Sequence, residues 1–470
     1  MTVSTDVAVV GAGPAGLSAA LAAAELGIEV YLIDSCRQAG GQYFKQLPAE
    51  FSAAAPTTAH QREAAALLVR LAQPNIKVLT ETLVWGIYED NLLTLTGPRA
   101  PTRLQARAVI LATGAYDRPV AFPGWTLPGV MTAGAAQTML KHQRLLPGRR
   151  ILLAGTGPLQ LAVAAGLVWG GADVAAVLEG NPHLLKAGLS QAWLMRGQGA
   201  RLAEGFTYVR TLWQAGVPYR LGWGLVKAVG TPADGVTGAV IAKLDSAWRP
   251  IPGSEQTVAC DTICVGYGLA PATELSRLAG AEHSYRPELG GWAPVRDPFK
   301  QTSVPQLYAV GDGAGIGGAL LARLEGRLAG LVAAHRIRDD HVTTPKLAER
   351  LRLELKQVAR EQKFQQLYGR LFTPGPGLAE LADDETVICR CEMVKLAEVK
   401  AAIALGADSA SAVKGLTRTG MGDCQGRMCG LLVAAQVARL TGRDLVEVGT
   451  YTARPPIHPL PLELLANAAK

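Results

Sequence analysis

Two kinds of apolar pattern alternate along most of the chain. Unbroken apolar runs such as residues 7–10 indicate buried parallel strands, whereas the alanine-rich segment after that run indicates a helix packed on them. The stretch DVAVVGAGPAGLSAALAAAELGIEVYLID (residues 6–34) thus predicts strand, glycine turn, helix and strand. RRILLAGTGPLQLAVAAGLVWGGADVAAVLEG (residues 149–180) repeats that order. We therefore predict an α/β fold with two Rossmann-like domains.

The first glycine turn has the spacing G-x-G-x-x-G. Its first glycine permits a tight bend, the second lets a pyrophosphate approach the backbone, and the third lets the helix pack against the strand. The helix N-terminus then offers N–H groups to phosphate, and an aspartate at the end of the second strand can accept hydrogen bonds from a ribose. The residues expected to line this nucleotide site are Gly11, Gly13, Pro14, Ala15, Gly16, Asp34 and Ser35.

Three later segments narrow the class of nucleotide. Residues 40–42 form another glycine turn, one buried strand ends at residues 112–114, and a later strand ends at residues 311–312 before a glycine-rich helix start. These segments resemble the two-dinucleotide-binding flavoproteins, a family that includes thioredoxin reductase and glutathione reductase, over roughly residues 1–335. The resemblance implies FAD, with an aspartate near the ribityl chain and pyrophosphate. It implies further FAD contacts at Gly41, Gln42, Val84, Ala112, Thr113, Gly114, Gly311 and Asp312.

The second nucleotide-type segment has a defect. Gly155 and Gly157 fill the first two glycine positions, but the third is Gln160, whose side chain has to be accommodated between helix and strand. Glu179 stands where a ribose-binding acid is expected, and no arginine follows it for a 2′-phosphate. The sequence leaves three alternatives open for this domain: NAD(H), another nucleotide such as ATP, or a purely structural role.

Cysteine spacing excludes one branch of the flavoprotein family. Disulfide reductases need two redox cysteines close to the flavin, as C-x4-C or C-x2-C. Cys36 has no such partner, and the pair Cys260 and Cys264 lies on or beside a predicted buried strand. We therefore predict that the flavin does not serve a dithiol.

The stretch 184–230 adds an amphipathic segment, which either covers the sheet or forms a subunit contact.

Four cysteines near the C-terminus form a separate pattern. They follow the linker TPGPG (residues 373–377) and are spaced C-x-C, 32 residues, C-x4-C. Four thiolates suit zinc or an iron–sulfur cluster, but C-x-C is uncommon in zinc sites. The spacing resembles the bacterioferritin-associated ferredoxin fold, which implies a [2Fe–2S] cluster, although the second pair departs from that fold's C-x2-C. The intervening residues predict two helices with a turn at GAD (residues 406–408). The expected ligands are Cys389, Cys391, Cys424 and Cys429.

The motifs at both ends of the chain resemble one group. The FAD fold, the crossover FPGWTLPGV (122–130), the cysteine motif GMGDCQGRMCG (420–430) and the tail RPPIHPLPLE (454–463) are similar to the larger flavin subunit of heteromeric amine dehydrogenases. That group includes opine oxidase, D-hydroxyproline dehydrogenase, dye-linked proline dehydrogenase and hydrogen cyanide synthase. The resemblance implies a hetero-oligomer with a partner flavoprotein subunit similar to sarcosine or glycine oxidase, which carries the substrate site, and in some arrangements a small third subunit.

The resemblance also implies the reaction. The complex oxidises the C–N bond of an amino acid, imino acid or opine, and this chain passes the electrons to an external acceptor. Hydrogen cyanide synthase, which converts glycine to HCN and CO2, is the alternative within the group. A free-standing NADH:acceptor flavin reductase with a fused ferredoxin is the alternative from another class. The sequence identifies no catalytic acid or base, since neither His142 nor His458 has a predictable partner.

Length and charge bound the remaining possibilities. The 470 residues carry a net charge of +7 with no lysine or arginine block, so we expect no nucleic-acid partner. No signal-like segment or long uncharged apolar run is evident, so we expect a cytoplasmic protein, with membrane contact only through partners. The expected domains are 1–115 with 288–335 for FAD, 116–287 for the second nucleotide fold, 336–380 as helical linker, 381–446 for the [2Fe–2S] module and 447–470 as proline-rich tail.

Overall fold

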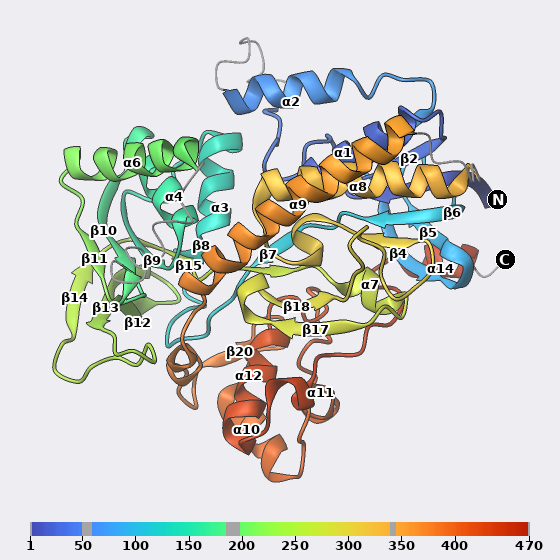
Figure 1. Ribbon diagram of the computed structural model, residues 1–470. Coiled ribbons are helices and arrows are strands. Elements are labelled where there is room, and N and C mark those ends of the chain that lie inside the picture. Colours follow the sequence, from blue (N-terminus) through green and yellow to red (C-terminus); the bar gives the residue numbers. More distant parts are fainter. Residues whose placement is uncertain (1, 49–58, 185–197, 339–344, 469–470) are drawn as a thin grey trace. The chain divides into compact units, whose positions relative to one another are not determined.

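The computed structural model describes residues 2–48, 59–184, 198–338 and 345–468 (Figure 1). The chain divides into two compact units. Unit 1 comprises Met1–Tyr116, Ala270–Gly369 and Thr452–Lys470, and unit 2 comprises Asp117–Leu269 and Arg370–Tyr451. Unit 1 thus resumes at residue 270 and again at residue 452, so that residues 452–470 of the expected proline-rich tail fall in unit 1.

Unit 1 is built on a seven-stranded sheet of order β3-β2-β1-β6-β5-β4, with β19 beside β6. Strands β3, β2, β1, β6 and β19 are parallel, and β4, β5 and β6 form an antiparallel meander. Their bounds are β1 Thr2–Val10, β2 Val30–Ile33, β3 Ile76–Leu79, β4 Leu83–Tyr88, β5 Leu92–Thr96, β6 Arg103–Leu111 and β19 Leu307–Ala309. The sheet therefore has the predicted Rossmann core.

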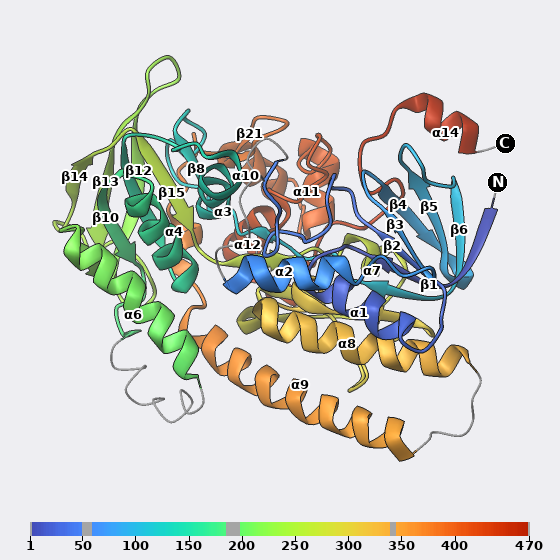
Figure 2. The same ribbon diagram turned by 90° about the horizontal axis from the view of Figure 1, so that it is seen from above.

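Two helices, α1 (Pro14–Ala24) and α8 (Gly318–Ile337), pack on the parallel part of this sheet. Helix α9 (Pro345–Leu371) lies on the outside of α8 in Figure 2. Two glycines allow α8 to approach α1 closely, because a Cβ at Gly326 or Gly330 would lie 2.0 or 2.3 Å from a carbonyl oxygen of α1. The other α-helices and strands of unit 1 are α2 Ala59–Val69, β7 Ala115–Asp117 (which runs one residue into unit 2), β16 Leu269–Pro271 (which begins one residue before unit 1 resumes), α7 Glu274–Leu278, β17 His283–Arg286, β18 Gly291–Pro294 and α14 Leu462–Ala468.

Unit 2 contains the second nucleotide fold. Its parallel sheet has the order β11-β10-β9-β15-β8, and a separate antiparallel sheet has the order β12-β13-β14. The strands are β8 Val130–Thr132, β9 Arg150–Gly155, β10 Asp173–Glu179, β11 Tyr219–Leu221, β12 Trp223–Thr231, β13 Gly235–Lys243, β14 Gln256–Ala259 and β15 Thr262–Gly266. The helices are α3 Ala133–Thr138, α4 Pro158–Trp169 and α6 Gly199–Gln214. Both predicted Rossmann-like folds are thus confirmed.

The four-cysteine segment also belongs to unit 2 and shares its core. Trp125 is buried among apolar side chains of both parts, and its Nε1 donates to the carbonyl of Val387 at 2.7 Å. The two helices predicted between the cysteine pairs are confirmed, with the turn at residues 406–408 between them. The elements are β20 Val387–Cys389, β21 Val394–Lys395, α10 Leu396–Ala404, α11 Ala410–Thr417, α12 Gly430–Thr441 and α13 Leu445–Val448.

Neither unit offers a helix that could cross a bilayer: in the described part of the chain, no helix is both long and apolar enough.

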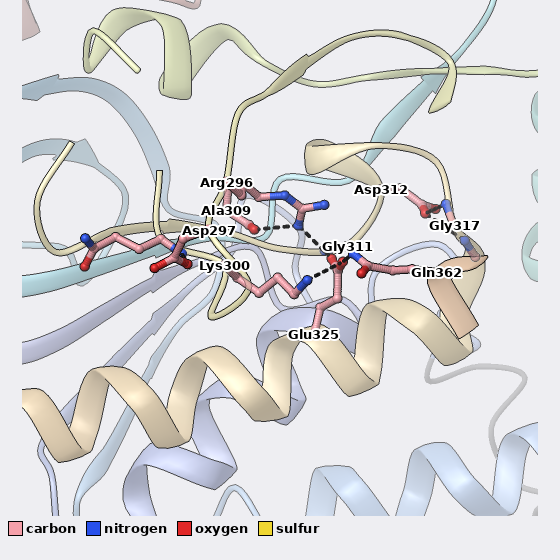
Figure 3. Close-up of polar contacts among 11 residues, drawn as sticks. Arg296, Asp297, Lys300, Ala309, Gly311, Asp312, Gly317, Glu325 and Gln362 are labelled. Atoms are coloured by element: carbon pink, nitrogen blue, oxygen red, sulfur yellow. Dashed lines mark hydrogen bonds and ion pairs between the residues drawn. The ribbon is translucent and has the colours of Figure 1, made fainter. Parts of the chain in front are cut away.

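A buried ionic group lies under the end of β19 (Figure 3). Glu325 of α8 is 1 % exposed, and its carboxylate pairs with Arg296 at 2.8 Å and with Lys300 at 3.7 Å. It also accepts hydrogen bonds from the Gly311 N–H at 3.0 Å and the Gln362 amide at 2.9 Å. Burial alone would raise the pKa of Glu325, but Arg296 and Lys300 outweigh it and hold that pKa below its ordinary value.

The Glu325→Gln variant tests this group. Removing one partner of a buried ion pair leaves two cations uncompensated, so we expect a loss of about 3 kcal/mol in the free energy of unfolding at pH 7. Because the folded-state pKa is depressed, the stabilisation is present above the unfolded pKa of about 4.3 and is lost as the pH falls through the folded pKa.

Urea unfolding followed by circular dichroism at several pH values measures this difference. The control is Glu349→Gln, which removes an exposed partner of Arg352 and should cost less than about 0.5 kcal/mol. Equal losses in the two variants, or a gap that widens toward pH 4, would contradict the assignment.

Candidate functional site

The first glycine turn of unit 1 forms one wall of the expected nucleotide cradle. Gly11 has φ +103°, and a Cβ there would lie 2.2 Å from the carbonyl oxygen of Ala112, so only glycine fits. A Cβ at Gly16 would lie 1.7 Å from the Gly11 carbonyl oxygen, which explains how α1 packs close to β1. Gly13 caps α1 without a side-chain hydrogen bond and is only partly buried. The helix N-terminus with Pro14 and Ala15 is therefore available to a phosphate.

A second glycine turn forms the other wall of the cradle. The Gly40 N–H donates to the Ala12 carbonyl at 2.7 Å, and a Cβ at Gly41 would lie 2.7 Å from the Gly13 Cα. Gln42 follows in an exposed position beside this turn. The two turns thus approach each other through their backbones, which suits a ligand that lies flat on main-chain atoms.

Asp34 occupies the expected position at the end of β2. Its carboxylate accepts from the Ala12 N–H at 2.6 Å and from the Cys36 N–H at 2.8 Å. The side chain is partly exposed, so it keeps lone pairs for ribose hydroxyls. Ser35 beside it is exposed, and the Thr82 N–H donates to the Asp34 carbonyl, which brings the start of β4 and Val84 alongside.

The carboxyl ends of β1, β6 and β19 meet at the same edge of the sheet. The Ala112 N–H donates to Val10 at 2.8 Å, and the Val310 N–H donates to Leu111 at 2.9 Å. The segments 112–114 and 311–312 therefore lie beside the first glycine turn, at the edge where ligands of open α/β sheets bind. Thr113 and Gly114 are partly exposed there.

Asp312 begins the glycine-rich loop before α8. Its Oδ1 accepts from the N–H groups of Gly317 and Gly318, both at 2.9 Å, and burial raises the pKa of this carboxyl group. The preceding Gly311 is held by Glu325, so the buried ionic group fixes the turn that carries Asp312 (Figure 3). Glu325 is therefore a positioning residue, and no motif in the sequence pointed to it.

The glycine turn of the second nucleotide fold, in unit 2, differs from the first glycine turn of unit 1. Gly155 and Gly157 are buried, and Glu179 is 1 % exposed and accepts four hydrogen bonds from the chain. Burial raises the pKa of Glu179. The structure therefore brings together all three residues predicted for a second nucleotide site, but in a closed arrangement.

The four C-terminal cysteines lie side by side in unit 2. The thiol of Cys391 contacts that of Cys424, Cys424 contacts Cys429, and Cys429 contacts Cys389. Cys429 donates one hydrogen bond to Cys389 and another to Cys424. These two bonds lower the pKa of Cys389 to about 6 and the pKa of Cys424 to about 5, and they raise the pKa of Cys429 itself. Cys389 and Cys429 are buried, whereas Cys391 is exposed.

The contacts between these thiols run from one to the next. In the described ranges, no group of three or more histidine, cysteine, aspartate or glutamate side chains is arranged around a point for a single metal ion. The donor set itself consists of four sulfurs, two of which are readily ionised, and this chemistry suits soft metals.

Tyr451 explains the glycines of the cysteine motif. A Cβ at Gly420 or Gly426 would lie 2.5 Å from the Tyr451 ring, and one at Gly422 would lie 2.4 Å from the Cys391 Cβ. The Tyr451 hydroxyl lies 3.7 Å from the Cys429 sulfur. The motif therefore wraps around this ring, a role that the glycine spacing alone did not reveal.

The other three cysteines lie in surroundings that raise the pKa of a thiol. Cys260 and Cys264 are buried, and burial raises their pKa values to about 11 and about 12. Cys36 is exposed and its pKa is raised by partial burial and by Asp34. A nucleophilic thiolate is therefore disfavoured at all three positions.

Comparison with known proteins covers almost the whole chain. Residues 5–337 match the family model of pyridine nucleotide-disulphide oxidoreductases, and residues 384–469 match that of the sarcosine oxidase A3 domain. The HcnB component of hydrogen cyanide synthase from Pseudomonas aeruginosa is 33% identical, with 98% of each chain covered. An opine oxidase subunit of Agrobacterium tumefaciens is 31% identical, with 98% of this chain and 91% of that one covered.

Solved structures support the fold. L-proline dehydrogenase from P. horikoshii covers 99% of this chain and 80% of its own with a TM-score of 0.68 at 22% identity. T. acidophilum thioredoxin reductase covers 71% of this chain and 98% of its own with a TM-score of 0.51. These likenesses and the matched family model confirm an FAD-type nucleotide fold in unit 1.

The relatives also confirm the predicted group, since subunits of opine oxidase and of hydrogen cyanide synthase both align along nearly the full chain. The chain therefore belongs to the pyridine nucleotide-disulphide oxidoreductase family, and within it to the group formed by the HcnB component of hydrogen cyanide synthase and the corresponding opine oxidase subunit.

Proposed function

We propose that this chain is the FAD and [2Fe–2S] electron-transfer subunit of a heteromeric oxidoreductase in the cytoplasm that oxidises the C–N bond of an amino acid, imino acid or opine. The observation that carries this proposal is that one chain combines an FAD-type glycine turn with four cysteine thiols that contact each other in series. Bound FAD supplies two-electron acceptance and a bound cluster supplies one-electron transfer.

The spacing of the cysteines is what favours a [2Fe–2S] cluster over zinc in this proposal. The first pair is C-x-C, which is uncommon in structural zinc sites, and the order C-x-C, 32 residues and a second close pair resembles a helical [2Fe–2S] ferredoxin module. Cys389, Cys391, Cys424 and Cys429 are the proposed ligands.

The substrate site belongs to another subunit in this proposal. The opine oxidase and sarcosine oxidase relatives are themselves subunits of larger enzymes, and we expect a sarcosine- or glycine-oxidase-like flavoprotein as the partner. There the C–N bond of the donor loses two electrons and two protons and becomes an imine. Water then converts the imine into a carbonyl compound and a free amine, and the electrons reach this chain and an external acceptor.

Hydrogen cyanide synthase is the second candidate, because its HcnB component is 33% identical to this chain. It requires glycine as donor and releases cyanide and carbon dioxide. An assay of the purified complex with glycine, proline, hydroxyproline and opines separates the two candidates. Cyanide release from glycine would select the second, and a carbonyl product from the other donors would select the first.

The cofactor content of the purified chain tests the two proposed cofactor sites. We expect about one FAD, two irons and two sulfides per purified chain. Gly41→Val should lower the FAD content at least about tenfold, because its side chain would collide with Gly13, and it should leave iron unchanged. Cys429→Ser should lower the iron content and leave the FAD content unchanged.

Flavin absorbance after denaturation and elemental analysis provide the measurement. Cys260→Ala is the matched control, because it removes a buried thiol outside the four-cysteine segment, which is called the cysteine module from here on. It should change neither the FAD content nor the iron content. Zinc in place of iron, or a chain without flavin, would refute the proposal.

A second prediction concerns the hydroxyl of Tyr451. A hydrogen bond to a ligating sulfur stabilises the more negative, reduced state of a cluster. Losing about 0.5–1.5 kcal/mol in Tyr451→Phe should lower a one-electron reduction potential by about 20–60 mV. Redox titration followed by electron paramagnetic resonance measures it, with Tyr88→Phe as control in unit 1. An unchanged potential would remove Tyr451 from this role.

A third prediction concerns the partner. Helix α6 exposes large apolar side chains, in the segment for which the sequence left a subunit contact open, namely Leu202, Phe206, Val209 and Trp213. Replacing Phe206 and Trp213 by glutamate should reduce the partner subunit recovered with a tagged chain at least about fivefold, with FAD content unchanged. Gln214→Glu on the same helix is the control. Undiminished recovery would exclude α6 from the subunit contact.

A further inference from the structure

The two nucleotide folds use equivalent residues in opposite ways. In unit 1, Gly13 is partly exposed at an uncapped helix start. In unit 2, the equivalent Gly157 is buried, and a Cβ there would meet the Phe372 ring at 3.6 Å. The second glycine of such a turn exists so that a pyrophosphate can approach the backbone. In this fold, the side chain that approaches it is Phe372 of the same chain.

The ribose-binding position is also taken. Glu179 accepts from the Thr156 hydroxyl at 2.6 Å, the Gly157 N–H at 3.0 Å, the Asn181 N–H at 3.0 Å and the Gln160 amide at 3.3 Å. Four donors fill the lone-pair sites of a carboxylate. The Gly157 N–H, which would otherwise point toward a phosphate, is also directed to this carboxylate. Asp34 in unit 1, by contrast, is partly exposed and is given two donors.

The buried side chain of Gln160 stabilises this arrangement through two hydrogen bonds. It stands where the third glycine of the motif would be, is 1 % exposed, and donates to Glu179 and to the Leu178 carbonyl at 3.2 Å. Its Oε1 has no hydrogen-bond partner among the described residues. An unsatisfied buried acceptor destabilises the folded state, so this side chain is accommodated at a cost in stability.

The segment that carries Phe372 is fastened along its length. The Asn181 amide donates to the Leu371 carbonyl at 2.7 Å, and the Gly377 N–H donates to Ala247 at 2.8 Å. A Cβ at Gly375 would lie 2.5 Å from the Trp248 ring. Further on, Arg249 makes two hydrogen bonds of 2.9 Å with Glu380. The glycines of TPGPG therefore let the linker lie flat on the second nucleotide fold, just before the cysteine module.

We propose that the second nucleotide fold of this chain does not bind a dinucleotide, because the linker residue Phe372 and the buried pair of Gln160 and Glu179 occupy its site, and that this fold instead anchors the cysteine module. NADH and NADPH are then not electron donors of this chain, despite the nucleotide-binding family to which it belongs. The inference does not depend on which C–N donor the complex oxidises.

Equilibrium binding to the purified, flavin-loaded complex tests the proposal. We expect calorimetry with NADH, NADPH and ATP to give dissociation constants weaker than about 1 mM, and anaerobic NADH to leave the flavin absorbance unchanged. Micromolar binding of NADH by the wild-type complex would overturn it.

An opening variant tests the cause. In Phe372→Ala combined with Gln160→Gly, we expect NADH affinity to rise at least about tenfold, while Phe372→Tyr keeps the ring and should remain closed. A double variant that folds, keeps its FAD and still shows no gain would overturn the assignment of these side chains as the block.

Proteolysis provides a readout of anchoring that does not require nucleotide. Trypsin cleavage between Arg370 and Leu371, followed by mass spectrometry, should be at least about tenfold faster in Phe372→Ala than in the wild type and Phe372→Tyr. Equal cleavage rates in all three would show that the Phe372 contact does not hold the linker.

Discussion

The carboxylate that ends the second strand of a nucleotide-binding fold must receive hydrogen bonds, because an unpaired buried charge is too costly. In unit 1, Asp34 takes two backbone N–H groups and keeps the rest of its capacity for a ligand. In unit 2, Glu179 takes four donors from the chain and is sealed from water. In our proposal, this single difference separates a cofactor site from a structural support, and the other functional proposals depend on it.

In the same proposal, the closed second fold supports the cysteine module. Apolar side chains of both parts form one core, with Trp125 bonded to Val387 at the start of the cysteine segment. Tyr451 then fills the centre of the glycine-rich motif and lies against Cys429. A redox relay requires cofactors held at fixed positions more than it requires acids and bases. Both proposed cofactor sites of this chain are built mainly from backbone, glycine and sulfur.

Local patterns could be predicted from the sequence because the chemistry that they serve is local. The glycine turns, Asp34 and the four cysteines follow from spacing along one strand, turn or helix. The sequence also identified Gln160 as a defect, but not its consequence, because Phe372 arrives from a linker more than 200 residues away. Glu325 could not be assigned either, since its role depends on Arg296 and Lys300 from a different part of the fold. No change in composition marks residue 270, where unit 1 resumes, so the sequence offers no signal for that boundary.

The electrons of this chain are proposed to come from a C–N donor through a partner subunit. Anaerobic mixing of the purified complex with candidate amine donors, and separately with NADH, followed by flavin absorbance and low-temperature electron paramagnetic resonance, tests this proposal most directly. We predict that at least one amine donor bleaches the flavin and produces the signal of a reduced [2Fe–2S] cluster, while NADH does neither. Rapid bleaching by NADH with no response to any amine would contradict it.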